Sequence, residues 1–136
     1  MTTISHHAAL IYTMVMVSAA DRDMTDAELR MIGEITKGLP VFVDYNLGLL
    51  TQTAAACAEL LDDENGMEQA IQLIESALPA KLRETAYALA CDVAAADGKV
   101  SEEEVRMLEI LQQRLRIDGL TAVAIERGAR ARFAKL

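Results

Sequence analysis

A sixteen-residue pattern occurs twice in this chain, at residues 17–32 and again at residues 93–108. The two copies lie 76 residues apart and share seven identical positions, where unrelated segments would share about one. Each copy has an apolar stretch, an aspartate, a short polar loop and then the periodicity of a surface helix. The repeat therefore predicts two helix–loop–helix units, at about residues 5–38 and 80–116. Two copies are too few for an open solenoid, so we expect a duplicated globular domain.

Apolar residues recur every three or four positions along most of the chain, which indicates amphipathic α-helices. Only 2 Pro and 7 Gly are present, too few for the many tight turns of an all-β fold. The length of 136 residues favours a single domain over residues 1–136. Apolar residues make up 52% of the chain but aromatic residues only 4%, so the core should be aliphatic. We predict a compact all-α bundle of about seven helices, at residues 5–20, 25–37, 44–61, 67–77, 79–96, 101–115 and 118–134.

Residues at the helix boundaries support this division. Gly38 is expected to end the second helix in a left-handed conformation, and Pro40 prevents its continuation. The apolar connector at residues 41–43 is expected to tuck into the core. Pro79 suits the first turn of the fifth helix, and Asp118 can cap the seventh.

The charge distribution excludes some ligands. With 13 basic and 21 acidic residues the net charge is −8, so the chain should repel the nucleic-acid backbone and small oxyanions alike. We therefore expect neither nucleic-acid binding nor direct oxyanion binding. The last ten residues are basic and contain no acid; their basic residues are Arg127, Arg130, Arg132 and Lys135. This segment is predicted to be a solvated helix end, with a contact to anionic lipid or an acidic protein as the alternative.

The longest apolar run, residues 8–20, is too short to span a membrane and lacks the basic flank of a signal peptide. It is interpreted as a buried core helix. Cys57 and Cys91 are far apart in Ala-rich helical segments, which favours two buried, reduced thiols over a disulfide or a redox pair.

Enzymatic activity is not expected. The chain has no Gly-rich phosphate loop and no Ser–His–Asp or Cys–His arrangement. His6 and His7 are adjacent, so on a helix they point about 100° apart and cannot easily chelate one ion. We expect a surface or N-terminal position for both. Nothing basic flanks either cysteine, which argues against a reactive, low-pKa thiol.

Each copy of the repeat begins its second helix with a capping-box pattern. Thr25 with Glu28, and Ser101 with Glu104, have the spacing in which hydroxyl and carboxylate each bind the other residue's backbone amide. This role alone could account for both glutamates. The hydrophobic-staple positions around the two boxes are Met24 with Leu29, and Val100 with Val105.

Asp21 and Asp97 are identical across the repeat and follow an Ala-rich helix. A local aspartate turn is one explanation. The other is a cation site, because the spacing from Asp97 to Glu104 matches the second half of an EF-hand loop, although the first half is missing. If the two loops meet, their carboxylates would repel unless they hold a hard divalent cation, Ca²⁺ or Mg²⁺. The predicted metal ligands are Asp21, Glu28, Asp97 and Glu104, with Asp23, Asp92 and Glu103 as auxiliaries.

The duplicated pattern Ala-Ala-Asp-Gly-x-Val-Ser-x-x-Glu in an acidic all-α chain resembles the tellurite-resistance protein TerB family, and also the TerB-like domain of some DnaJ-type membrane co-chaperones. Residues 95–104 carry the pattern fully, whereas residues 19–28 have Arg22 where the family usually has Gly. The first loop is therefore expected to differ in shape, since Arg adopts positive φ at some cost.

The resemblance implies a compact seven-helix fold and a cytoplasmic role in resistance to tellurite or metal-related stress. It also implies partners, namely other Ter proteins in a complex at the inner membrane, and an acidic surface that binds metal or partner. Two hypotheses follow. One is a non-enzymatic module whose acidic loops bind a divalent cation. The other is an interaction scaffold whose acidic face docks partners without metal.

Overall fold

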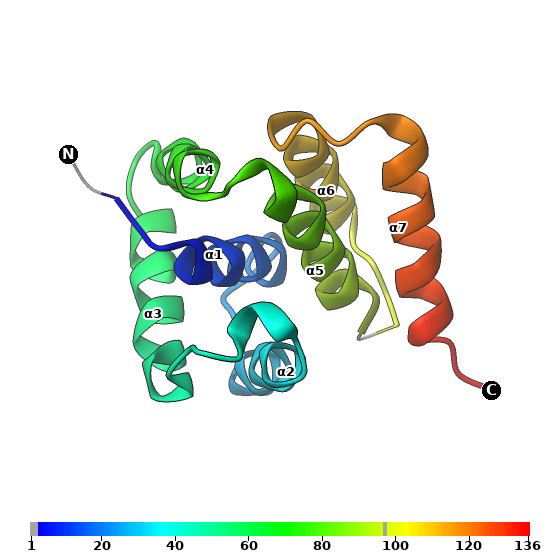
Figure 1. The fold of residues 1–136 in the computed structure, drawn as a ribbon, viewed down its shortest axis with the longest axis horizontal. Coiled ribbons are helices and arrows are strands. Elements are labelled where there is room, and N and C mark those ends of the chain that lie inside the picture. The colour runs from blue at the N-terminus through cyan, green and yellow to red at the C-terminus, as the bar shows by residue number, and fades with distance from the viewer. Residues whose placement is uncertain (1–2, 97) are drawn as a thin grey trace.

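Every regular element is helical in the part of the chain that the computed structural model describes, residues 3–96 and 98–136. The α-helices are α1 (His6–Ser18), α2 (Asp26–Lys37), α3 (Leu50–Leu61), α4 (Gly66–Ala77), α5 (Arg83–Ala96), α6 (Glu102–Arg114) and α7 (Gly119–Arg132). Three 3₁₀ turns, η1 (Pro40–Phe42), η2 (Leu47–Leu49) and η3 (Ala80–Leu82), connect them. The predicted all-α bundle of about seven helices is confirmed (Figure 1).

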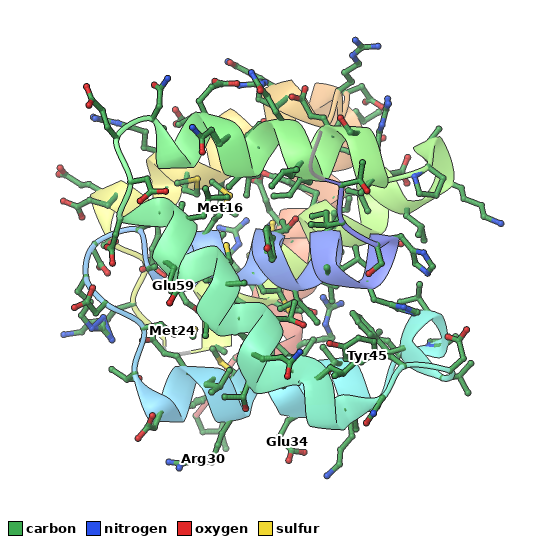
Figure 2. The ribbon with its side chains drawn as sticks, turned by 90° about the vertical axis from the view of Figure 1, so that its left-hand side faces the viewer. Met16, Met24, Arg30, Glu34, Tyr45 and Glu59 are labelled. Carbon is green, nitrogen blue, oxygen red and sulfur yellow. The ribbon has the colours of Figure 1, made fainter. Side chains whose placement is uncertain are left out.

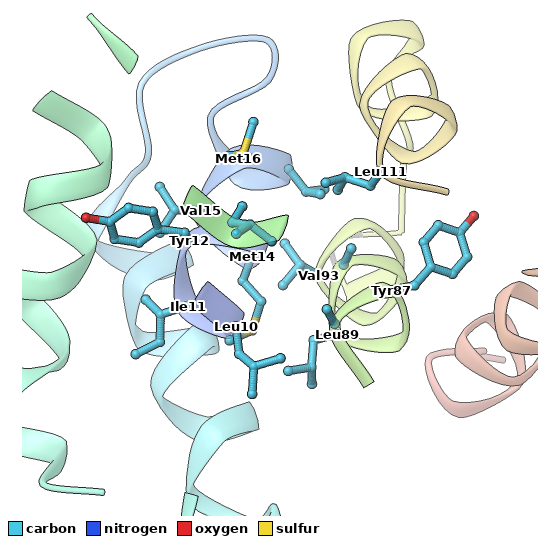
Figure 3. Close-up of a cluster of buried hydrophobic side chains, with 14 of the residues drawn as sticks. Leu10, Ile11, Tyr12, Met14, Val15, Met16, Tyr87, Leu89, Val93 and Leu111 are labelled. Carbon is cyan, nitrogen blue, oxygen red and sulfur yellow. The ribbon is translucent and has the colours of Figure 1, made fainter. Parts of the chain in front are cut away.

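Helix α1 is the centre of the bundle (Figure 1). Its residues from Ala9 to Ser18 are all buried, because an apolar sequence without a polar face cannot form a surface helix. Helices α3, α4 and α5 pack directly around it, and α2 and α6 complete the enclosure. Side chains of α1 such as Leu10 and Met14 meet Leu89 and Val93 of α5 (Figure 3). The interpretation of this segment as a buried core helix is confirmed.

Two predicted helix starts were too early. Residues 44–49 do not join α3, because Asn46 is extended and its side chain accepts a hydrogen bond from Gly48 N at 2.9 Å, which sets up the turn η2. At the fifth helix, Pro79 is extended rather than helical and precedes the turn η3, so α5 begins at Arg83. The predicted cap at Asp118 is confirmed, since its carboxylate accepts from Thr121 N at 3.0 Å.

The end of α2 also differs from the prediction. Gly38 has φ −94° and so is not left-handed; the chain leaves α2 through an extended Leu39 into η1. Within the connector only Phe42 is fully buried, whereas Val43 is 87% exposed. Phe42 is the last residue of η1 and faces the core, whereas Val43 follows the turn and is directed to solvent.

Both histidines lie in the first turn of α1, but only His6 is at the surface, because His7 is covered. Its side chain is 13% exposed, and Nε2 donates to the carbonyl of Val41 at 2.8 Å. The ring also packs against Phe42 and Tyr45, with centroids 5.3 and 5.1 Å away. The connector after α2 therefore folds over the first turn of α1. The prediction assumed an uncovered helix start, and only His6 remains exposed.

Helices α4 and α6 are joined by a charged cluster. Arg114 Nη2 lies 2.7 Å from Glu68 Oε2 and 2.6 Å from Glu75 Oε1. The hydrogen bond from Arg114 holds the pKa of Glu68 below its usual range. Arg114 is the last residue of α6, so this cluster links the end of the second predicted unit to α4, which lies between the two units in the sequence.

Gly66, the first residue of α4, gives a direct test of this packing. A Cβ at this position would lie 1.9 Å from the backbone oxygen of Leu60, which cannot move without distorting α3. We expect Gly66→Ala to lower the free energy of unfolding by about 1–3 kcal/mol, measured by urea denaturation.

The matched control is Gly119→Ala. Gly119 is also the first residue of a helix, and a Cβ there would meet nothing within 4 Å. Its substitution should change stability by no more than about 0.5 kcal/mol. Equal effects of the two substitutions would contradict the packing described.

Candidate functional site

The first acidic loop connects α1 to α2 and ends in a complete capping box. Glu28 N donates to Thr25 Oγ1 at 3.1 Å, and Thr25 N donates to Glu28 Oε1 at 2.9 Å. Met24 and Leu29 of the predicted staple are partly buried and pack on the core. The structural role predicted for Glu28 is therefore confirmed.

Asp21 and Glu28 do approach a common point, but an arginine occupies it. Arg22 Nη1 lies 3.6 Å from Asp21 Oδ1, and Arg22 Nη2 lies 3.6 Å from Glu28 Oε1. The two carboxylate side chains are 26% and 14% exposed. The guanidinium thus neutralises part of the negative charge for which the sequence predicted a bound metal ion.

The second loop precedes α6 and contains the same box. Glu104 N donates to Ser101 Oγ at 3.1 Å, and Ser101 N donates to Glu104 Oε1 at 3.0 Å. Glu104 is 6% exposed. Gly98 has φ +81°, a conformation that Gly adopts without a steric penalty. Asp97, the other predicted ligand of this loop, lies outside the described residues.

The remaining candidate ligands are dispersed. Within residues 3–96 and 98–136, no group of three or more His, Cys, Asp or Glu side chains is placed to hold a metal ion. Asp92 forms an ion pair with Arg132, which ties α5 to α7. Asp23 and Glu103 are exposed to solvent. A meeting of the two loops involves Asp97 and stays a prediction.

Both cysteines are buried free thiols, as predicted. Burial raises the pKa of Cys57 to about 12, and it raises the pKa of Cys91 to the same value. A thiol with such a pKa is protonated at neutral pH and is a poor nucleophile or reductant.

The sequence did not predict a groove that opens between α6 and α7, which both pack on α5 (Figure 1). It holds about 350 Å³ and is mostly apolar. Val100 and Val105, the predicted staple of the second unit, are 46% and 45% exposed at its rim. The groove is lined by Tyr87, Cys91, Ala94, Ala95, Val100, Val105, Leu108, Glu109, Gln112, Glu126, Ala129 and Arg130.

A partly buried hydrogen bond joins α5 to α7 in the groove. Tyr87 extends from α5 towards α7 (Figure 3), and its hydroxyl donates to Glu126 Oε2 at 2.6 Å. Burial and this hydrogen bond raise the pKa of Tyr87, so the phenol remains protonated. Glu126 thereby presents a carboxylate inside an apolar groove. The sequence contains one indication of this surface. The repeat aligns Val100 and Val105 with Met24 and Leu29, which are partly buried in the first unit.

The fold and its two capped acidic loops define a small all-α acidic module. A family model described as tellurite resistance protein TerB matches residues 7–126. The chain therefore belongs to the TerB family, as its repeated motif suggested. No curated protein and no solved structure shows significant similarity to it. Among the residues that the structure describes, none of the helices has the length and apolar character needed to cross a membrane.

The raised thiol pKa values make a prediction about reactivity. With a pKa of about 12, only about one thiol in ten thousand is ionised at pH 8. We expect Cys57 and Cys91 to react with iodoacetamide far more slowly in the native protein than in urea, as measured by mass spectrometry. Rapid native alkylation of Cys91, which lines the groove, would show that its thiol is accessible and activated.

Proposed function

We propose that this chain is a non-enzymatic TerB-family scaffold that contributes to tellurite or metal-stress resistance in the cytoplasm by binding protein partners. The observation that carries the proposal is the open apolar groove between α6 and α7. Two valines that are nearly half exposed at the rim of one groove are typical of a contact surface rather than of scattered surface residues.

The chemistry of the groove favours one kind of partner. A helix fits between two helices when its apolar residues recur every three or four positions. The groove also contains the carboxylates of Glu109 and Glu126, against a single guanidinium from Arg130. The best occupant is therefore an amphipathic partner helix with a basic residue directed at Glu126. Other Ter proteins, in a complex at the membrane, are the expected source of such a helix.

Direct chemistry on tellurite is not part of the proposal. A chain of net charge −8 repels an oxyanion. Reduction by a thiol would require an ionised cysteine, and burial keeps both cysteines protonated.

The docking surface can be tested with Val105→Asp. A charge on the exposed rim should leave the fold intact but place a carboxylate against the apolar face of the partner, opposite Glu126. We expect loss of tellurite resistance in cells that depend on this protein, with the native circular dichroism spectrum retained.

Val43→Asp is the matched control, because Val43 is 87% exposed and does not line the groove. It should keep full resistance. A Val105→Asp protein that folds and still confers resistance would rule out docking in this groove.

A second candidate function is divalent-cation binding at the second acidic loop. It is favoured by the left-handed Gly98, which allows the tight turn between Asp97 and the capping box that a cation loop requires. Ca²⁺ or Mg²⁺ would be the cofactor, because the available donors are oxygens. In this case the protein would act as a cation-dependent module.

Calorimetric titration of the full chain with Ca²⁺ separates the two candidates. Cation binding predicts a dissociation constant no weaker than about 10⁻³ M, and its loss in Asp97→Asn. Ser101→Ala is the control for the capping role, since it should cost about 1 kcal/mol of stability and leave Ca²⁺ affinity unchanged. Absence of saturable binding, or equal affinity in Asp97→Asn, would rule out the cation site and leave the scaffold as the remaining candidate.

A further inference from the structure

The two acidic loops differ in the two residues that follow the aspartate, which are Arg22 and Asp23 in the first loop and Gly98 and Lys99 in the second. In the first loop the arginine side chain is 52% exposed and lies beside two carboxylates of the same loop. One terminal nitrogen approaches Asp21 and the other approaches Glu28, each at 3.6 Å. Asp21 and Glu28 are the residues that the repeat aligns with Asp97 and Glu104.

The arrangement has the features of an ion site whose cation is part of the chain. Glu28 Oε1 also accepts from Thr25 N at 2.9 Å and from Thr25 Oγ1 at 3.1 Å, so donors already surround it. A guanidinium presents several donors in one plane and can contact two carboxylates at once. Because Arg22 is tethered to the loop, its effective concentration at the carboxylates is high, and a dissolved cation must displace it.

We infer that Arg22 is the resident cation of the first acidic loop and that it excludes divalent cations from Asp21 and Glu28. The side chain acts as a specificity-determining residue of the first loop, since it lies beside both carboxylates that would hold a divalent cation there. The inference stands whether or not the second loop binds a cation, because it concerns side chains of the first loop alone. It is also independent of partner docking in the groove.

The test removes the guanidinium in a background where Asp97 is substituted. The ¹⁵N-labelled full-length Asp97→Asn protein is titrated with CaCl₂ at constant ionic strength, and the amide signals of Thr25 and Glu28 are followed by NMR. We expect no saturable shift in Asp97→Asn. In Arg22→Gln/Asp97→Asn we expect saturable shifts at both amides in the millimolar range of weak oxygen-ligand sites, about 10⁻³ M.

Two further variants isolate the cause. Arg30→Gln/Asp97→Asn removes the same charge from α2 at a side chain that projects away from the bundle (Figure 2), and it should remain silent. Arg22→Lys/Asp97→Asn keeps the positive charge but not the planar guanidinium, so it should respond less than Arg22→Gln/Asp97→Asn. The inference is overturned if Arg22→Gln responds no more than its Asp97→Asn parent, if that parent already saturates at the first loop, or if Arg22→Lys responds as Arg22→Gln does.

Discussion

The structure depends on the enclosure of α1. A helix that is apolar on every side loses its hydrophobic stabilisation wherever it meets water, so other helices must cover it completely. Helices α3, α4 and α5 provide most of this cover, and residues from Ala9 to Ser18 are buried as a result. This packing determines the positions of the loops at the two ends of α1. At its start, His7 holds the connector of residues 41–45, and at its end the first acidic loop leads into α2.

Several carboxylates of the chain interact with groups of the chain itself, which leaves less negative charge for a ligand. Glu28 and Glu104 each bind a backbone amide at the start of a helix, where the helix dipole also favours a carboxylate. Arg22 takes up charge from Asp21 and Glu28, and Arg132 takes up charge from Asp92. Four of the predicted metal ligands that the structure describes are therefore engaged with amides or guanidinium groups of the same chain, namely Asp21, Glu28, Asp92 and Glu104. The two loops differ in the two residues after the aspartate, Arg22 and Asp23 in the first and Gly98 and Lys99 in the second.

The sequence was sufficient for the features that depend on local patterns. Helical periodicity predicted the all-α bundle, and the spacing of Thr25 with Glu28 and of Ser101 with Glu104 predicted both capping boxes. It was insufficient where tertiary packing decides. The burial of His7 depends on a connector about 34 residues away along the chain, and within that connector the chain buries Phe42 but exposes Val43, which follows the turn η1. The ion pairs of Arg22 could not be read from composition either, since a charged side chain next to an acid can equally extend into solvent.

The groove shows how a repeated sequence can give unequal surfaces. The repeat aligns Met24 and Leu29 with Val100 and Val105. In the first unit α3 packs against both α1 and α2, so the staple residues lie against the core. In the second unit α7 packs on α5 and is held there by Tyr87 with Glu126 and by Asp92 with Arg132. These polar contacts fix α7 at a position that leaves Val100 and Val105 nearly half exposed. The open groove is thus a consequence of how α7 is anchored, and a partner helix lying there would supply the apolar cover that the first unit obtains from its own chain.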